Sequence, residues 1–288
     1  MANAKTRKVW IGVGAFVLAG GVATTTQALP PLGAHRSDLR TGKTKLLDGA
    51  SALPGRLILA QGQGAGGEGG EGKIDPAAVE ADPIDYGVAL QVIAAHYHAG
   101  LLAYENKQQE AGAQMFAHGL TEVYVELEDI FKKRGVTGLG DKMNAAVEAG
   151  TANKPVREVR QKVKAVLDAL AAAEAGAPKS DKPPQAIKTE VMAEMLERAA
   201  AQYSASVNST DFETYLDGLG FSLAAREQAR AVMPWLKKQA PKKAAALEKV
   251  LVLVNQAYPG IKRPAKKVDG GRFLAAASEA RVAVSHLP

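Results

Sequence analysis

The sequence predicts an all-α protein, an antiparallel helical bundle made of two helical sub-bundles, and three observations lead to this prediction. Hydrophobic residues make up 47% of the 288 residues but aromatic residues only 5%, whereas β-sheets draw heavily on aromatic and β-branched residues. From about residue 82 onward, apolar residues recur at spacings of three and four, the pattern of a helix with one apolar face. Short stretches rich in Pro and Gly interrupt this pattern, as turns between helices do.

The first 28 residues are typical of a secretory signal peptide. A positively charged start precedes an apolar segment, residues 9–23, and a small-residue cleavage site that ends at Ala28, with Ala23 as the alternative site. The apolar segment is shorter than the roughly 20 residues that span a bilayer, so an uncleaved membrane anchor is the less favoured interpretation. We expect a periplasmic or secreted protein with no transmembrane segment in the mature chain.

Residues 29–81 are expected to form a flexible Gly/Pro-rich linker. They show little apolar periodicity and include a Gly-rich run over residues 61–72, which cannot bury enough apolar surface to offset its backbone entropy. Gly62, Gly64 and Gly67 match the spacing of a dinucleotide-binding fingerprint. Because that fingerprint requires a helix to begin at once, and more glycine follows here, we interpret the run as a linker.

Helices are then predicted in two groups, an N-terminal sub-bundle over residues 82–177 and a C-terminal sub-bundle over residues 178–288. The first two helices, 85–107 and 110–134, should form an antiparallel hairpin because only a short turn separates them. We expect the helix over 212–238 to be broken or kinked near Gly218 and at Pro234. The other predicted helices cover residues 141–149, 156–175, 185–207, 242–258 and 270–286.

Charge is divided unevenly along the chain. Residues 68–130 hold 12 Asp/Glu and 2 Lys/Arg, a balance of −10, whereas residues 131–288 hold 26 Lys/Arg and 16 Asp/Glu, a balance of +10. The two regions could attract each other within the bundle, or the acidic hairpin could face cations. Cleavage of the signal removes three basic residues and lowers the formal charge from +6 to +3. Few aromatic residues lie between the lysines of residues 237–267, so we expect no nucleic-acid partner.

The composition narrows the chemistry that is available. The chain has no cysteine, which excludes disulfides, thiolate metal sites and thiol nucleophiles. Sequence motifs of zinc peptidases, ferritin-type di-iron proteins, serine hydrolases and P-loop proteins are absent. Five histidines therefore carry most of any metal or acid–base chemistry.

Histidines and carboxylates converge on the first predicted hairpin. His118, Glu122 and Glu126 follow one another at intervals of four and so share one stripe of the second helix. In an antiparallel hairpin, His96 of the first helix lies level with Glu122, so His96, His118 and Glu122 can meet at one point. Two imidazoles and a carboxylate suit iron, copper or zinc. The alternative is that these histidines are surface or core-edge residues, and His98 is expected to point away from His96.

Two parts of the chain resemble known iron-uptake proteins. Residues 95–101 and 116–124 resemble the exported helical proteins of the imelysin and EfeO/EfeM group, although that group typically has a His-x-x-Glu motif and this chain has His118-x-x-x-Glu122. Residues 200–207 and 212–221 are similar to the soluble extracytoplasmic domain of FTR-type iron permeases. The resemblance implies metal ligation by His96, His118 and Glu122. It also implies possible further ligands from the second region, namely Tyr203, Tyr215 and Asp217.

The sequence thus leads to one favoured function and two alternatives. The favoured function is an exported, soluble metal-binding protein for iron acquisition or handling in the cell envelope, with copper or zinc as other possible metals and a membrane transporter or envelope protein as candidate partner. The first alternative is a non-catalytic envelope scaffold or adaptor that docks through its oppositely charged regions. The second is a peptidase-like enzyme, for which the sequence shows no general base beside a nucleophile.

Overall fold

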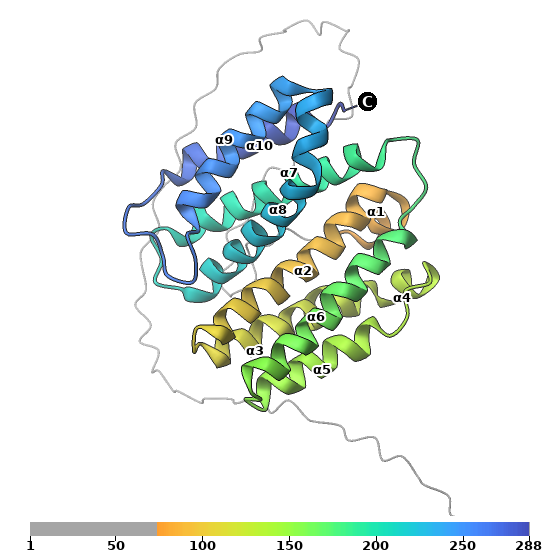
Figure 1. Cartoon of the computed structure of the whole chain (residues 1–288), viewed down its shortest axis with the longest axis vertical. Coiled ribbons are helices and arrows are strands. Elements are labelled where there is room, and N and C mark those ends of the chain that lie inside the picture. Colours follow the sequence, from red (N-terminus) through yellow and green to blue (C-terminus); the bar gives the residue numbers. More distant parts are fainter. Residues whose placement is uncertain (1–73, 288) are drawn as a thin grey trace, which may run out of the picture. The chain divides into compact units, whose positions relative to one another are not determined.

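A computed structural model describes residues 74–287, and all regular structure in this part of the chain is helical (Figure 1). The expected signal peptide, and the expected linker as far as residue 73, lie outside the described residues. The α-helices are α1 (Pro76–Ala81), α2 (Pro83–Glu105), α3 (Gln109–His118), α4 (Val125–Lys133), α5 (Leu139–Thr151), α6 (Val156–Ala173), α7 (Pro184–Ser206), α8 (Phe212–Gln239), α9 (Pro241–Ala257) and α10 (Gly270–Val284). A π-helical turn, η1 (Gly119–Tyr124), joins α3 to α4, and a 3-10 turn, η2 (Glu174–Gly176), follows α6.

The helical region begins before residue 82, so the expected linker boundary was wrong at its C-terminal end. Asp75 caps α1 by accepting a hydrogen bond from the Ala77 amide, and Pro76 occupies the first helical turn, where its missing N–H costs nothing. Val79 is fully buried, and α1 packs on α2 and α4. The cap, the buried Val79 and the ion pair between Glu80 and Lys133 of α4 hold this short helix against the bundle.

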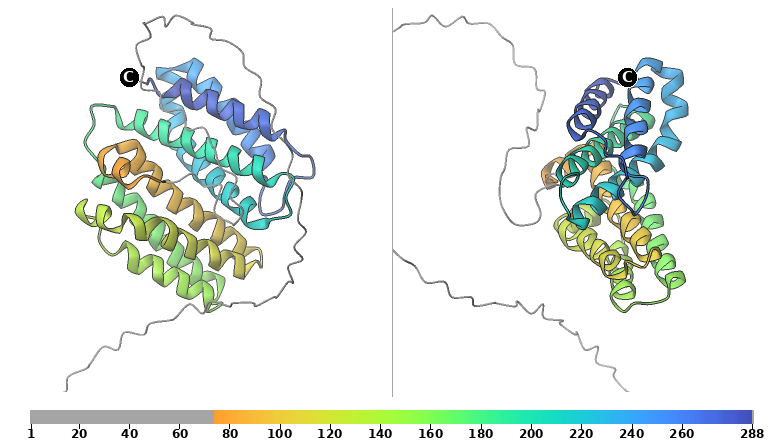
Figure 2. Two further views of the ribbon diagram at one scale, coloured as in Figure 1. Left: turned by 180° about the vertical axis from the view of Figure 1, so that it is seen from behind. Right: turned by 90° about the vertical axis from the view of Figure 1, so that its left-hand side faces the viewer.

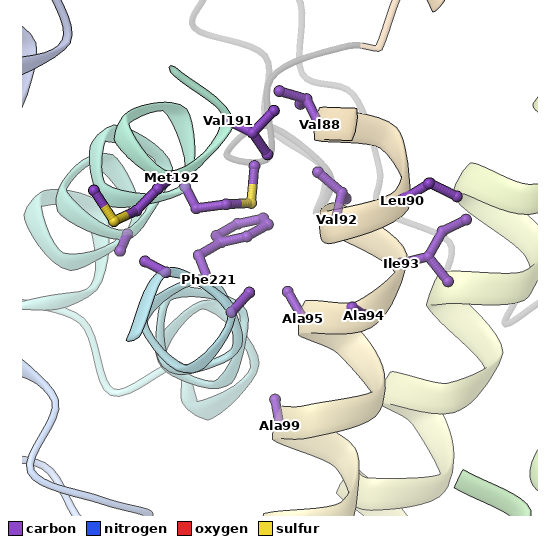
Figure 3. Close-up of a cluster of buried hydrophobic side chains, with 14 of the residues drawn as sticks. Val88, Leu90, Val92, Ile93, Ala94, Ala95, Ala99, Val191, Met192 and Phe221 are labelled. Carbon is purple, nitrogen blue, oxygen red and sulfur yellow. The ribbon is translucent and has the colours of Figure 1, made fainter. Parts of the chain in front are cut away.

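Helix α2 lies at the centre of the described region. It packs on α3 and α6 on one side and on α7 and α8 on the other (Figures 1 and 2). Val92 and Ala95 face Phe221 of α8, whereas Leu90 and Ile93 point the opposite way (Figure 3). A helix that is apolar all round is typically buried in a core. Because α2 serves both groups of helices, the groups on either side of the 176–184 connection share one core.

Glycines allow α2 to approach its neighbours closely. A β-carbon at Gly220 of α8 would lie 2.5 Å from the Ala95 carbonyl oxygen, and one at Gly112 of α3 would lie 2.6 Å from the Gly100 carbonyl oxygen. The glycines of α8 therefore serve helix packing and do not interrupt it, since Phe212–Gln239 is one helix with Pro234 inside it. The expected break in this helix was wrong, because tertiary contacts compensate for the low helix propensity of glycine, whereas the alternative of a kink stays a prediction.

The two oppositely charged regions meet within the bundle. Lys133 lies 2.9 Å from Glu80, and Arg160 lies 2.7 Å from Glu105. Partly exposed pairs of this kind contribute little stability each, but they neutralise part of the acidic hairpin locally. Among residues 74–287, no helix combines the length and the apolar composition needed to cross a membrane.

Candidate metal centre

His96 is held in the core of the molecule by its own helix. Its side chain is only 2% exposed, and its Nδ1 lies 2.8 Å from the Val92 carbonyl oxygen one turn earlier in α2. A carbonyl oxygen can only accept, so Nδ1 carries the hydrogen of this bond. In the neutral imidazole the lone pair then belongs to Nε2, the nitrogen able to bind a metal ion.

His118, the last residue of α3, is brought against His96 as the hairpin prediction required. The centroids of the two imidazole rings are 6.4 Å apart, and the ring planes meet at 76°. Gly119 makes this approach possible, because a β-carbon there would lie 3.2 Å from both the His96 β-carbon and the Tyr97 ring. The antiparallel α2–α3 hairpin is therefore sufficient to place two imidazoles side by side.

Glu122 lies in the π-helical turn, which the sequence did not reveal. The Val125 amide bonds the Leu120 carbonyl, five residues back instead of four, so the turn holds one extra residue. Glu122 nevertheless stays beside His118, with its Oε1 3.9 Å from Nε2.

The extra residue changes the helix face that follows. Each residue of an α-helix advances by about 100°, so α4 starts rotated relative to the stripe that His118 began. Glu126 lies on this rotated segment, where it is exposed. Among the described residues it forms no ion pair with either histidine. The role of Glu126 as the second carboxylate of the stripe therefore stays a prediction.

Glu213 joins the cluster from the far half of the sequence, and the sequence reasoning missed it. Its Oε1 lies 3.5 Å from His118 Nδ1. It occupies the first turn of α8, which Asp211 caps by accepting hydrogen bonds from the amides of Glu213 and Thr214. The capping pattern predicted where α8 begins, but no sequence signal placed that helix end beside α3.

A small cleft opens beside this cluster. It has a volume of about 230 Å³ and lies between α3 and the start of α8, with Glu213 and Met115 in its wall. Asp211 lines it as well, so two carboxylates face the same space. Negative charge in a cleft raises the local concentration of cations, so cations are attracted to this side of the cluster.

His98 belongs to a separate contact. Its Nε2 lies 3.0 Å from Oε2 of Glu227 on α8, on the other side of α2 from the pairing with α3. The hydrogen bond from His98 holds the pKa of Glu227 below its ordinary value. His98 thus ties α2 to α8 and lies apart from the pair formed by His96 and His118.

The residues proposed from the second resemblance lie in or beside an aromatic cluster centred on Tyr258. The Tyr203 hydroxyl accepts a 2.9 Å hydrogen bond from the Val268 amide, and the Tyr215 hydroxyl donates to the Gly260 carbonyl at 2.8 Å. Both rings pack on Tyr258, with centroids 5.6 and 5.3 Å away. Asp217 is close enough to Tyr258 that its charge helps burial to raise the pKa of that phenol. These contacts fasten the loop before α10 to α7 and α8.

The fold and the site define the class of protein: an all-α bundle with a His/Glu cluster where α2, α3 and α8 meet. Within residues 74–287, no three His, Asp or Glu side chains already form a group that could hold a metal ion. Comparisons with known proteins found no matching family model, no matching curated protein and no matching solved structure. The resemblance to imelysin-like and permease-associated proteins therefore stays a prediction.

Proposed function

We propose that this protein binds a transition-metal ion through His96, His118 and Glu122 and acts in metal acquisition or handling outside the cytoplasm. The observation that carries the proposal is the orientation of the two neighbouring imidazoles. In each ring Nδ1 faces an oxygen acceptor, the Val92 carbonyl for His96 and the Glu213 carboxylate for His118. Metal-binding histidines typically donate one ring N–H to such an acceptor, which fixes the tautomer and leaves the other nitrogen as ligand.

The arrangement needs only side-chain movement to bind an ion. Glu122 lies on the Nε2 side of His118, opposite to Glu213, so it approaches the nitrogen that a metal would use. The side chains of His118 and Glu122 are 23% and 34% exposed, which leaves them room to change rotamer. The ion itself would supply the free energy for drawing the three ligands together.

The donor set restricts the metal. Two imidazoles and a carboxylate, without thiolate, suit iron, zinc and copper, whereas magnesium and calcium prefer oxygen ligands alone. Iron is the first choice because of the resemblance to iron-uptake proteins. Export, and a transporter or envelope protein as partner, are proposed on the signal-like start of the chain and on the same resemblance.

Metal content is the direct test of this proposal. The full-length gene is expressed with export, and metals bound to the purified protein are measured by mass spectrometry for wild type, His118→Ala and the pair His96→Ala/His118→Ala. We expect about one iron, zinc or copper ion per chain in wild type and loss of that ion in both variants. His98→Ala is the matched control, because His98 lies on the same helix as His96 but pairs with Glu227, and it should retain the metal.

Two outcomes would contradict the proposal. One is wild-type protein that is metal-free and does not bind ferrous, zinc or cupric ions on reconstitution at micromolar concentration. The other is metal that persists in the double variant or is lost equally in His98→Ala. Circular dichroism of each variant separates loss of the site from loss of the fold, which matters for the buried His96. Wild type without metal would favour the envelope adaptor.

A further inference from the structure

We propose that a second site, a pocket between α2, α7 and α8, binds a small apolar carboxylate. The pocket has a volume of about 280 Å³ and is separate from the histidine cluster. It lies beside the 176–184 connection, where the two groups of helices meet, and clefts at such junctions are common places for small-molecule sites. This inference does not depend on the proposed metal site.

The walls of the pocket are mainly apolar. Apolar contact surface comes from Tyr86 and Leu90 on α2, from Ile187 and Val191 on α7, and from Pro178 in the connection. Helices α2 and α7 approach each other closely here, since a β-carbon at Gly87 of α2 would lie 2.8 Å from a methyl group of Val191 on α7. Apolar walls favour a ligand whose body is itself apolar, because its burial removes hydrocarbon surface from water.

A buried amide provides a polar group in this apolar wall. Gln228 of α8 lines the pocket and is only 9% exposed. A ligand group that hydrogen-bonds to this side-chain amide gains affinity, because the apolar part of the ligand excludes water from the pocket. In many ligand-binding sites, a small number of polar groups in an otherwise apolar pocket fix the orientation of the ligand.

Ammonium groups at the edge of the pocket can bind an anion. Lys182 and Lys188 line it together with one acidic residue, Glu174. Lys182 is paired with Glu190 at 2.7 Å, so the two lysines offer an anion their remaining N–H donors and not an unpaired charge. Lys188 lies 2.7 Å from Glu174, and both side chains are partly exposed. A ligand carboxylate can share Lys188 with Glu174, because an ammonium group has three donors.

The volume limits the size of the ligand. A cavity of about 150 Å³ accommodates benzene, so one of about 280 Å³ accommodates a bicyclic aromatic ring or a medium-length alkyl chain. A ligand of roughly 13 non-hydrogen atoms at about −0.3 kcal/mol per atom would bind with a Kd of about 1 mM or tighter. The expected class is therefore a bicyclic aromatic acid or a medium-length alkyl carboxylic acid.

Titration of the full chain with 2-naphthoate, followed by isothermal calorimetry and by amide chemical shifts, tests the proposal. We expect saturable binding at about 1 mM or below, with shifts confined to residues around the pocket. Gln228→Leu and Lys188→Gln should each weaken binding about fivefold, the effect of one lost hydrogen bond or exposed ion pair. Gln239→Leu, on the exposed end of the same helix, is the matched control and should bind like wild type.

Three results would overturn the proposal. They are absence of saturable binding up to several millimolar, equal binding of the uncharged methyl 2-naphthoate, and unchanged binding in Ala177→Phe, which fills the pocket from the connection without altering a helix. Gln228→Leu replaces a buried amide by an apolar group of similar size and should leave the fold intact. Its thermal unfolding is measured alongside, so that weaker binding is not mistaken for unfolding.

Discussion

The contact between α2 and α8 makes Gly220→Ala the sharpest test of the packing described above. In an exposed helix, alanine in place of glycine would stabilise by about 1 kcal/mol. At Gly220, however, the new β-carbon would lie 2.5 Å from the Ala95 carbonyl oxygen and 2.9 Å from its carbon. Both are backbone atoms of α2, so the obstacle cannot be relieved by a side-chain rotation.

The expected magnitude follows from the displacement. Carbon–oxygen contacts of this kind are normally about 3.3 Å or longer, so α2 and α8 must separate locally by about 0.8 Å. Overpacking of a close-packed core typically costs about 1–3 kcal/mol, occasionally more. Because the obstacle is backbone, we take the upper end of this range, about 3 kcal/mol. Subtracting the gain in helix propensity of about 1 kcal/mol leaves an expected net loss of about 2 kcal/mol in the free energy of unfolding.

Urea denaturation followed by far-UV circular dichroism measures this loss. With a slope of about 2 kcal/mol per molar urea, the midpoint should fall by about 1 M while the slope stays the same. Gly271→Ala is the control, because it lies in the first turn of α10 and its β-carbon would meet nothing closer than 3.5 Å. If Gly220→Ala is as stable as Gly271→Ala, the close approach of α2 and α8 is refuted.

Two other predictions concern the turn before α8 and the loop that covers it. Asp211→Ala should lower stability by about 1 kcal/mol at pH 7 through loss of the helix cap. Hydrogen bonds from Thr214 hold the pKa of Asp211 in the folded protein below its ordinary value of 3.8. The stabilisation by the cap is therefore fully present above pH 3.8 and is lost as the pH falls through the lower pKa of the folded state. A stability difference between Asp211→Ala and wild type that stays constant down to about pH 2 would contradict this prediction. Burial raises the pKa of Tyr215 to about 12, and the nearby Arg263 guanidinium opposes the rise, so Arg263→Ala should move phenolate absorbance at 295 nm to higher pH. Arg263→Ala should also destabilise by about 1–3 kcal/mol, because the guanidinium donates to the Ser206 and Asp211 carbonyls and lies over the Tyr215 ring; wild-type stability in urea would rule this out.

The candidate site shows how far local reasoning extends. The placement of His96 beside His118 followed from a hairpin whose two helices and short turn are all encoded within residues 83–118. The π turn after His118 did not follow, because no local sequence pattern reveals the extra residue that it holds. Glu213 could not be assigned at all, since its contact with His118 joins segments far apart in the chain.

The second group of proposed ligands illustrates a different limit. Tyr203 and Tyr215 are polar-tipped aromatics that sequence alone leaves open to binding or packing. Their hydroxyls meet backbone groups of the loop before α10, an interaction that depends on where an irregular segment returns to the bundle. Such segments have no apolar periodicity, so no local sequence pattern predicts where they lie in the fold.

By itself the sequence determined the helical class of this protein, most helix positions and the first hairpin, because helix periodicity, caps and turn residues act over a few neighbouring positions. Tertiary structure alone decided that α2 is shared by both groups of helices, that α8 stays unbroken through its glycines and proline, that Glu213 lies against His118, and that Gln228 lines a cavity beside α2 and α7. These outcomes depend on which helix surfaces fit together at van der Waals distance. That fit is set by side-chain volumes from segments far apart in the sequence, so no single segment determines it.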